Sequence, residues 1–165
     1  MKSPSVTAWL LASLVAMPTL AVAHDPETQA RDAPVQRVSE QAKPAVAIVE
    51  QFSSALKSGD LTRASELLAD DVVILEGGGA EYSREEYLSG HAKHDAAFLK
   101  DAHVQVTRRT TGAEGPLAWV ATESELHVTE KGQPLTLLST ETMVLKRTAA
   151  GWRIVHIHWS SRPKR

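Results

Sequence analysis

The sequence predicts an α+β domain in which three N-terminal helices pack on a strongly curved, mostly antiparallel sheet. One observation is the helical spacing of apolar residues in the first half of the chain, at Val46, Val49, Phe52 and Leu56. A second is the change after Ala102 to short alternating segments separated by glycine-containing turns. Helices followed by hairpin-linked strands are typical of an α+β layer.

Residues 1–23 have the features of a secretory signal peptide. Lys2 precedes an apolar run at Val6–Met17, and Ala21–Ala23 is an A-x-A cleavage motif. The apolar run is too short to span a bilayer. We therefore expect a periplasmic or secreted protein. Residues 24–43 are polar and contain two prolines, which predicts a flexible leader with a helical end.

The composition excludes several function classes. Lys and Arg number 18 against 20 Asp and Glu, so no basic excess suggests nucleic-acid binding. No later apolar run is long enough for a membrane anchor, so no membrane contact is expected after signal cleavage. The chain has no cysteine, and its chemistry must use histidine, carboxylates, hydroxyls or a metal. We expect a single domain over residues 44–163.

The first two helices have clear boundaries. The first follows Pro44 and ends at Gly59, because glycine favours the left-handed conformation that closes a helix. Asp60 can cap a short second helix. Residues 71–79 then have the pattern of a buried strand that ends in a glycine turn. The three glycines lack the context of a nucleotide-binding motif, so no organic cofactor is expected.

The third helix is predicted to begin at Arg84, because Ser83 and Glu86 form a capping box. Placed at 100° per residue, its apolar sector contains His91 and Asp95, which are four residues apart. If this helix covers the sheet, the His91–Asp95 pair faces the interior.

Four strands should follow, approximately at residues 104–111, 117–129, 135–147 and 152–160. The turn between the last two strands pairs Arg147 with Trp152. The same register places Glu141 opposite His158 on the inner face of the sheet. A carboxylate opposite an imidazole would satisfy two polar groups on a mostly apolar surface.

Two His–carboxylate pairs therefore converge on one predicted cavity. The candidate catalytic residues are His158, Glu141, His91 and Asp95. The expected cavity wall also contains Tyr87, Phe98, Met143, Trp152, Ile154 and His156.

Three functions are compatible with this pattern. In the first, the exported protein binds a small hydrophobic ligand in an apolar cavity lined by the His–carboxylate pairs. The pattern leaves open whether it is an enzyme; if it is, a carboxylate-oriented imidazole, which titrates near neutral pH, moves a proton on a bound carbonyl compound or lactone. In the second, His91, His156 and His158 bind Zn or Cu together with a carboxylate. In the third, the protein is a non-catalytic dimeric accessory module whose cavity has only a structural role.

The opposite face of the last strand is also predicted to be apolar, because Val155, Ile157 and Trp159 alternate with the cavity residues. A sheet that is apolar on both faces needs cover on both faces. We therefore expect a homodimer through this outer face.

The order of elements and the ending "GWRIVHIHWSSR" resemble the SnoaL-like, or DUF4440, branch of the nuclear transport factor 2-like (NTF2-like) superfamily. The resemblance covers about Pro44–Pro163. It implies a conical sheet with an internal cavity, frequent dimerisation through the sheet, and uses that include polyketide cyclases, ketosteroid isomerases and dehydratases. An isomerase-like relative would have an Asp base and a Tyr-containing oxyanion site, and no matching motif occurs here. The fold alone does not fix the reaction.

Overall fold

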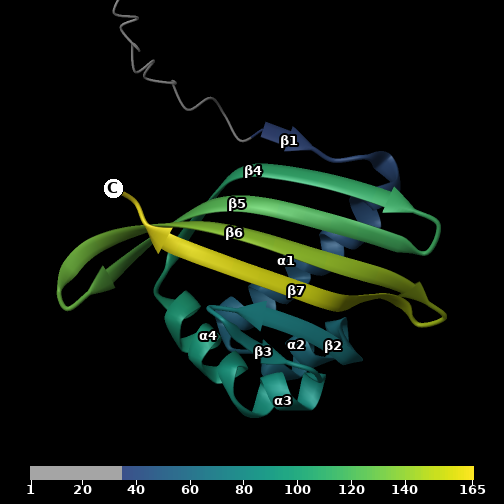
Figure 1. Cartoon of the computed structure of the whole chain (residues 1–165), viewed down its shortest axis with the longest axis horizontal. Coiled ribbons are helices and arrows are strands. Elements are labelled where there is room, and N and C mark those ends of the chain that lie inside the picture. The colour runs from purple at the N-terminus through teal and green to yellow at the C-terminus, as the bar shows by residue number, and fades with distance from the viewer. Residues whose placement is uncertain (1–34) are drawn as a thin grey trace, which may run out of the picture. The chain divides into compact units, whose positions relative to one another are not determined.

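A curved sheet is the frame of the molecule. The computed structural model describes residues 35–165, and within them seven strands lie in the order β1-β4-β5-β6-β7-β2-β3. The four long strands are antiparallel neighbours that arch side by side (Figure 1). They are β4 (His103–Glu114), β5 (Leu117–Glu130), β6 (Gln133–Thr148) and β7 (Gly151–Pro163). Beyond β7, β2 (Leu68–Glu76) runs parallel to it, and β3 (Gly79–Glu81) pairs antiparallel with β2.

The helices cover the inner face of this sheet. Helix α1 (Lys43–Ser58) lies against the long strands, whereas α2 (Leu61–Leu67), α3 (Arg84–Ser89) and α4 (His91–Lys100) gather at the end formed by β2 and β3 (Figure 1). Phe52 and Leu56 of α1 are fully buried in one core with Ile154 and Ile157 of β7. The predicted α+β class, with helices on a strongly curved, mostly antiparallel sheet, is confirmed.

The predicted ends of the first two helices are confirmed. Gly59 ends α1 with a φ of 75°, and its N–H binds the carbonyl oxygens of Ala55 and Leu56. Asp60 caps α2, since its side chain accepts a 2.9 Å hydrogen bond from the backbone N–H of Arg63. The compact α1–α2 corner follows from these two adjacent residues.

The third predicted helix begins where expected but is divided in two. Ser83 caps α3 through a 3.1 Å hydrogen bond from the N–H of Glu86. Gly90 then interrupts the helix with φ −120° and ψ −96°, and α4 starts at His91. Because Gly90 changes the direction of the chain, the angular position of His91 cannot be extrapolated from α3.

The second half of the predicted leader is structured. Residues Val35–Arg37 form β1, which runs parallel to β4, and Glu40–Ala42 form a 3-10 turn, η1, before α1. The N–H of Ser39 donates to Oγ1 of Thr111 on β4 at 3.1 Å. A strand at this edge satisfies backbone groups of β4 that would otherwise be unpaired. The predicted signal peptide at 1–23 and the rest of the predicted leader, up to residue 34, lie outside the described residues.

The predicted register of the last hairpin is correct only at its start. Arg147 lies opposite Trp152 and Leu145 opposite Ile154, as expected. A β-bulge at Val155 then shifts the pairing by one residue, so that Glu141 lies opposite Trp159 rather than His158. The bulge keeps large apolar side chains on the inner face along the whole strand, which explains why it is favoured over continuous pairing.

The bulge reverses inside and outside for the second half of β7. Ile157 is fully buried in the core, and Trp159 packs against that core. The predicted dimer surface of Val155, Ile157 and Trp159 is therefore wrong, because two of its three side chains point inward. The imidazoles of His156 and His158 lie on the outer side instead.

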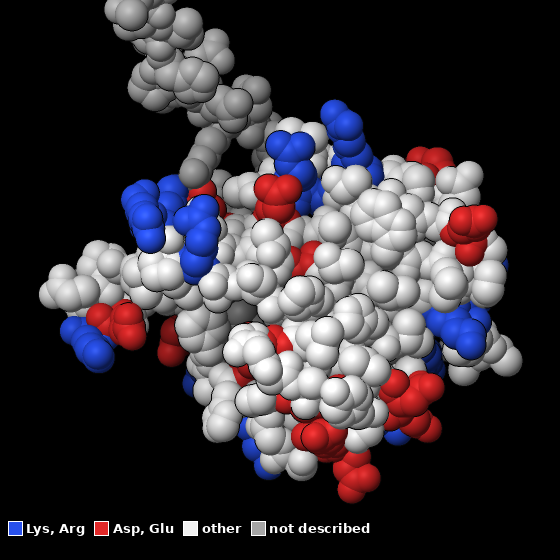
Figure 2. Space-filling view, in the orientation of Figure 1, with Lys and Arg blue, Asp and Glu red and all other residues white. Residues whose placement is uncertain are grey.

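The surface carries interspersed charges. On the face shown in Figure 2, Lys and Arg alternate with Asp and Glu around the edge, and the centre is mostly uncharged. Among residues 35–165, no helix is long and apolar enough to cross a membrane.

Candidate functional site

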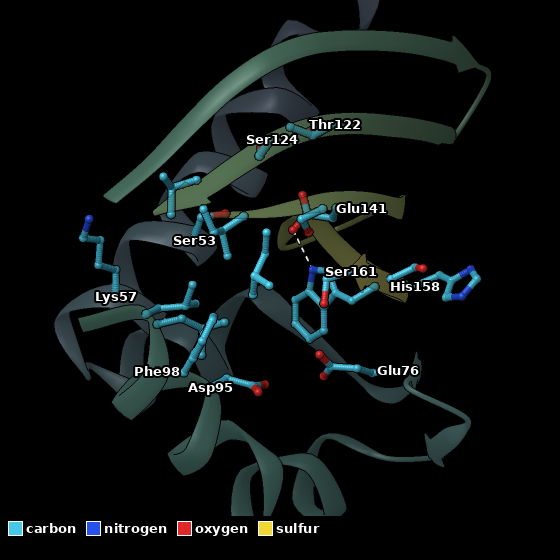
Figure 3. A pocket seen from close by; sticks show the side chains of 18 of the residues that line it. Ser53, Lys57, Glu76, Asp95, Phe98, Thr122, Ser124, Glu141, His158 and Ser161 are labelled. Carbon is cyan, nitrogen blue, oxygen red and sulfur yellow. Dashed lines mark hydrogen bonds between the residues drawn. The ribbon is translucent and has the colours of Figure 1, made fainter. Parts of the chain in front are cut away.

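A cavity of about 710 Å³ lies between the inner face of the sheet and helices α1 and α4. Its helical wall includes Phe52, Ser53 and Leu56 from α1, and Asp95, Phe98 and Leu99 from α4. Glu76 and the two glycines that follow it also line the cavity, and Figure 3 shows the side chain of Glu76 near that of Asp95. The sheet forms its floor. This volume is in the range of sites for drug-sized molecules.

The floor is arranged in rows across the strands. One row consists of Arg109, Thr122, Glu141 and Trp159, which are direct cross-strand partners on β4, β5, β6 and β7. All four line the cavity. Paired residues on one face of a sheet have neighbouring side chains, so a cation, a hydroxyl, a carboxyl and an indole lie in sequence.

The next row of the floor consists mostly of serine residues. Ser124 is the partner of Val106 and of Ser139, and Ser139 is in turn the partner of Ser161. Leu126 and Leu137 follow in the row beyond. The cavity floor therefore has a polar band, and the leucine row next to this band on the same face is apolar. This arrangement suits a mostly apolar molecule that carries a polar group.

Glu141 is the most enclosed acid of the cavity. Its Oε2 accepts a 2.7 Å hydrogen bond from Nε1 of Trp159 (Figure 3). Burial raises the pKa of Glu141 above that of an ordinary glutamate, while the Trp159 hydrogen bond and the charge of Arg109 act in the opposite direction. A carboxyl whose pKa is raised by burial is closer to the range useful for proton transfer at neutral pH.

Trp159 is itself held by aromatic contacts. Its ring stacks on Phe52 of α1, with centroids 6.4 Å apart and planes inclined by 13°. Tyr87 of α3 lies on a tilted plane with its centroid 6.3 Å away. Because the indole is fixed by these rings, its N–H holds the carboxyl of Glu141 in one orientation.

Asp95 faces the cavity from α4, as predicted. The hydroxyl of the fully buried Tyr87 donates to its Oδ2 at 2.8 Å. Burial raises the pKa of Asp95, and the Tyr87 hydrogen bond partly opposes this effect. The pKa of Glu76 is also raised, mainly by burial and to a smaller extent by the negative charge of Asp95. The side chains of Glu76 and Asp95 extend toward one another (Figure 3).

His91 does not pair with Asp95. Its Nδ1 instead contacts Oε1 of the buried Glu81 on β3, and its side chain is 55% exposed. The hydrogen bond and the charge of Glu81 raise the pKa of this imidazole. The Gly90 break explains the difference, because α4 starts with a rotation that points His91 away from the cavity.

The two histidines of β7 also differ from expectation. His156 Nδ1 lies 2.9 Å from the carbonyl oxygen of Val73, on the outer side of the sheet. His158 is at the cavity rim, but its ring points away from the labelled cavity residues (Figure 3). His91, His156 and His158 therefore do not form the metal site considered from the sequence. Among the described residues, no group of three His, Cys, Asp or Glu side chains could hold a metal ion.

The remaining predicted wall residues divide between core and cavity. Phe98 lines the cavity as expected. Tyr87 is buried behind it and supports Asp95. Met143, Trp152 and Ile154 are buried in the core and do not line the cavity.

Several cavity residues were missed from the sequence. Arg109 and Thr122 are examples, because β4 and β5 were not aligned with the last hairpin. A usable signal was present in β5, where Thr122 and Ser124 occupy the same alternating positions as Ala118 and Val120. Because Ala118 and Val120 are buried, the alternation places Thr122 and Ser124 on the same inner face.

Comparisons with known proteins agree with the fold. A family model described as "SnoaL-like domain" matches residues 46–163. No curated protein matches the chain.

Solved structures with the same fold extend the comparison. A candidate ketosteroid isomerase from Shewanella frigidimarina is 34% identical, with a TM-score of 0.68 over 71% of this chain and 94% of that one. A candidate dehydratase of the NTF2-like family from Streptomyces avermitilis is 20% identical, with a TM-score of 0.64 over 74% and 96%. The CaMKII hub of S. rosetta is 19% identical, with a TM-score of 0.61 over 76% and 99%. The last two likenesses concern the fold alone.

Proposed function

The chain belongs to the SnoaL-like family of NTF2-like proteins, and on that premise we propose that its cavity binds a small, mostly apolar carbonyl compound and moves a proton on it. The observation that carries this proposal is the buried Glu141 carboxyl, which lines the cavity and is held by the Trp159 indole. The likeness to a candidate ketosteroid isomerase supports the same reaction class.

Glu141 replaces His158 as the proposed base. An effective base must reach the substrate, keep a fixed orientation and have a pKa near the working pH. Glu141 lines the cavity, is oriented by Trp159 and has its pKa raised by burial. The ring of His158 points away, so the imidazole is not in a position to act.

The proposed step is enolisation. The carboxylate of Glu141 takes a proton from the carbon next to the carbonyl group, and the electron pair of that C–H bond moves to the carbonyl oxygen as the enolate forms. Glu141 then returns the proton to the same or a conjugated carbon. Asp95, held by Tyr87 on the opposite wall, is the candidate for a second acid or base.

A β,γ-unsaturated ketosteroid tests the proposal, because its conversion to the conjugated enone is followed by ultraviolet absorbance. Wild-type protein should accelerate the conversion, and Glu141→Gln should lower the rate at least about 100-fold, the usual minimum for removing an acid–base group. Glu123→Gln on the outer face of β5 is the matched control and should retain the wild-type rate. Equal rates for wild type and Glu141→Gln would contradict the role of this carboxyl.

We also propose self-association through the outer face of the sheet, at a different patch from the one first expected. Leu117 and Trp119 of β5 are 47% and 41% exposed. The Trp119 indole lies close against the backbone of β4 at Gly112. Any side chain at this position would clash, because its Cβ would lie 2.4 Å from Nε1 of Trp119. The likeness to a hub domain supports an assembly of this kind.

Export remains part of the proposal, on the basis of the signal-peptide pattern in residues 1–23. Protein recovered from the producing cell should have the mass of a chain that begins at His24. An intact chain beginning at Met1 in the cytoplasmic fraction would contradict export.

A further inference from the structure

We propose that the Lys57 ammonium binds a carboxylate at the remote end of the ligand, so that the cavity takes elongated carbonyl compounds that carry an acid group. This inference rests on the proposed function and names the residue that selects and orients the substrate. Lys57 lies in the last turn of α1 and lines the cavity. Lys57 and Glu141 are on opposite sides of the cavity in Figure 3.

The first support is the solvent-exposed rim of the cavity near Lys57. Phe98 of α4 and Val104 of β4 line the cavity although they are 45% and 38% exposed. Lys57 and Ser53, one turn apart on α1, are also exposed and line the cavity. Side chains that are both exposed and cavity-lining mark a part of the cavity that opens to solvent. An apolar ligand that covers Phe98 and Val104 removes their surface from water, which favours binding.

The second support is the position of the Lys57 ammonium at this rim. Its Nζ donates a 2.8 Å hydrogen bond to the carbonyl oxygen of Ala102. Ala102 is in the link between α4 and β4, two residues before Val104. A lysine ammonium has three N–H donors, and the bond to Ala102 uses one of them. The ammonium is thus held at the rim with donors left for a ligand.

The third support is the uncompensated charge of Lys57. Among residues 35–165, no carboxylate forms an ion pair with it. Arg109, another cation of the cavity wall, is by contrast paired with Glu50 at 2.6 Å. A hydrogen bond between an ammonium and a carboxylate is stronger than one between neutral groups. The cation at the rim therefore favours an acid over the corresponding ester or amide.

The carboxyl groups of the cavity do not neutralise this cation. Several charges shift the pKa values of Glu76, Asp95 and Glu141, and within the described part of the chain Lys57 is not one of them. The cavity therefore has a basic group on one side and its acids elsewhere. A ligand with one acidic end fits in one orientation only, because the reverse would bring its carboxylate toward carboxyl groups of the same charge.

These features limit the ligand class. The cavity walls include Leu56, Leu99 and Leu126, so the body of the ligand is mostly apolar. Its carboxylate lies at Lys57, and a carbon next to its carbonyl group lies at Glu141. Elongated keto acids and enone acids have both groups, one at each end of an apolar body.

The test uses a matched pair of fluorescent probes, dansylaminoundecanoic acid and its methyl ester. The dansyl group becomes brighter when it leaves water, and the two molecules differ only in the charged end. Wild-type protein should bind the acid about fivefold more tightly than the ester, as expected for an ion pair at a partly solvated rim. Adding about 0.5 M salt should reduce this preference, because salt screens exposed charges.

Lys57→Gln separates the charge of the side chain from its structural role. Glutamine removes the positive charge but keeps an N–H donor, so the variant should bind the acid and the ester equally and keep the wild-type affinity for the ester. Lys57→Arg retains the charge and should retain the preference for the acid. Lys93→Gln is the matched control, because Nζ of Lys93 also donates to a backbone carbonyl, that of Ser89, but Lys93 does not line the cavity.

The outcomes distinguish this inference from the proposed function. If wild-type protein binds neither probe, or if Lys57→Gln keeps the preference for the acid, the acid-binding role of Lys57 is wrong. Conversion of the ketosteroid that depends on Glu141 would then leave the proposed function intact. If the preference is lost in Lys57→Gln and kept in Lys57→Arg, the role of Lys57 is supported even where no ketone is converted, and only the proposed proton transfer is overturned.

Discussion

Nε1 of Trp159 donates a 2.7 Å hydrogen bond to Oε2 of Glu141, its direct cross-strand partner. The relationship depends on the bulge at Val155, because continuous pairing would place His158 opposite Glu141 instead. It joins the aromatic cluster of Phe52, Tyr87 and Trp159 to the most enclosed acid of the cavity.

Replacing the indole tests this relationship. Trp159→Phe keeps an aromatic ring near Phe52 but removes the donor to Glu141. The hydrogen bond lowers the pKa of Glu141, so its loss should raise that pKa further. The reaction rate should then increase at a higher pH in the variant than in the wild type. Loss of a hydrogen bond to a buried carboxylate should also cost about 1–3 kcal/mol of stability at neutral pH. A pH–rate profile identical to that of the wild type would show that Trp159 does not control the base.

The raised pKa of Glu141 predicts how stability changes with pH. A carboxyl whose pKa is higher in the folded than in the unfolded chain binds protons more tightly when folded. Its contribution to stability is therefore complete below the unfolded pKa and declines as pH rises through the folded pKa. Glu141→Gln removes this decline, so the variant should gain stability relative to the wild type as pH rises from the unfolded pKa of a glutamate through the higher folded pKa of Glu141.

Denaturant unfolding across that pH range is the measurement for Glu141→Gln. Glu76 and Asp95 have pKa values raised in the same direction and remain in the variant, so part of the decline should persist. Glu123→Gln, an exposed glutamate on β5, is the control and should follow the wild type. A stability difference between Glu141→Gln and the wild type that does not change with pH would contradict the raised pKa.

The outer face of β5 predicts an effect on association. Trp119→Glu places a charge on the exposed patch that also contains Leu117. A charge buried without a partner in an interface is strongly unfavourable. If the chain self-associates there, the variant should sediment at a lower mass than the wild type at micromolar concentration. Val155→Glu, on the outer side of β7, provides a comparison, and an equal effect of both variants would point to a broader interface.

Local patterns predicted the framework of the fold well. Features that depend only on neighbouring residues were recognisable in the sequence. They include the helix end at Gly59, the caps at Asp60 and Ser83, and the alternation of the four long strands. The structure also brings the candidate acids Asp95 and Glu141 to the cavity. Their partners were not, because partners come from other strands and helices.

Two single-residue irregularities account for the main errors. The bulge at Val155 changes which side chains of β7 face inward, and Gly90 changes the direction of α4. The bulge left a signal in the sequence, since the large apolar residues move from even positions at Trp152 and Ile154 to odd positions at Ile157 and Trp159. One extra residue between the two sets explains that change. Arg109 had no comparable local signal, because its role depends on strands that pair far along the chain.

The central claim is that the Glu141 carboxyl transfers a proton to and from a carbonyl compound in the cavity. Nuclear magnetic resonance of a saturated ketosteroid in D₂O measures this transfer directly, because each cycle replaces a hydrogen next to the carbonyl group with deuterium. Wild-type protein and Glu123→Gln should accelerate the exchange equally, whereas Glu141→Gln should reduce it to near the rate in buffer. Exchange at the wild-type rate in Glu141→Gln, with the ketone bound, would contradict the claim.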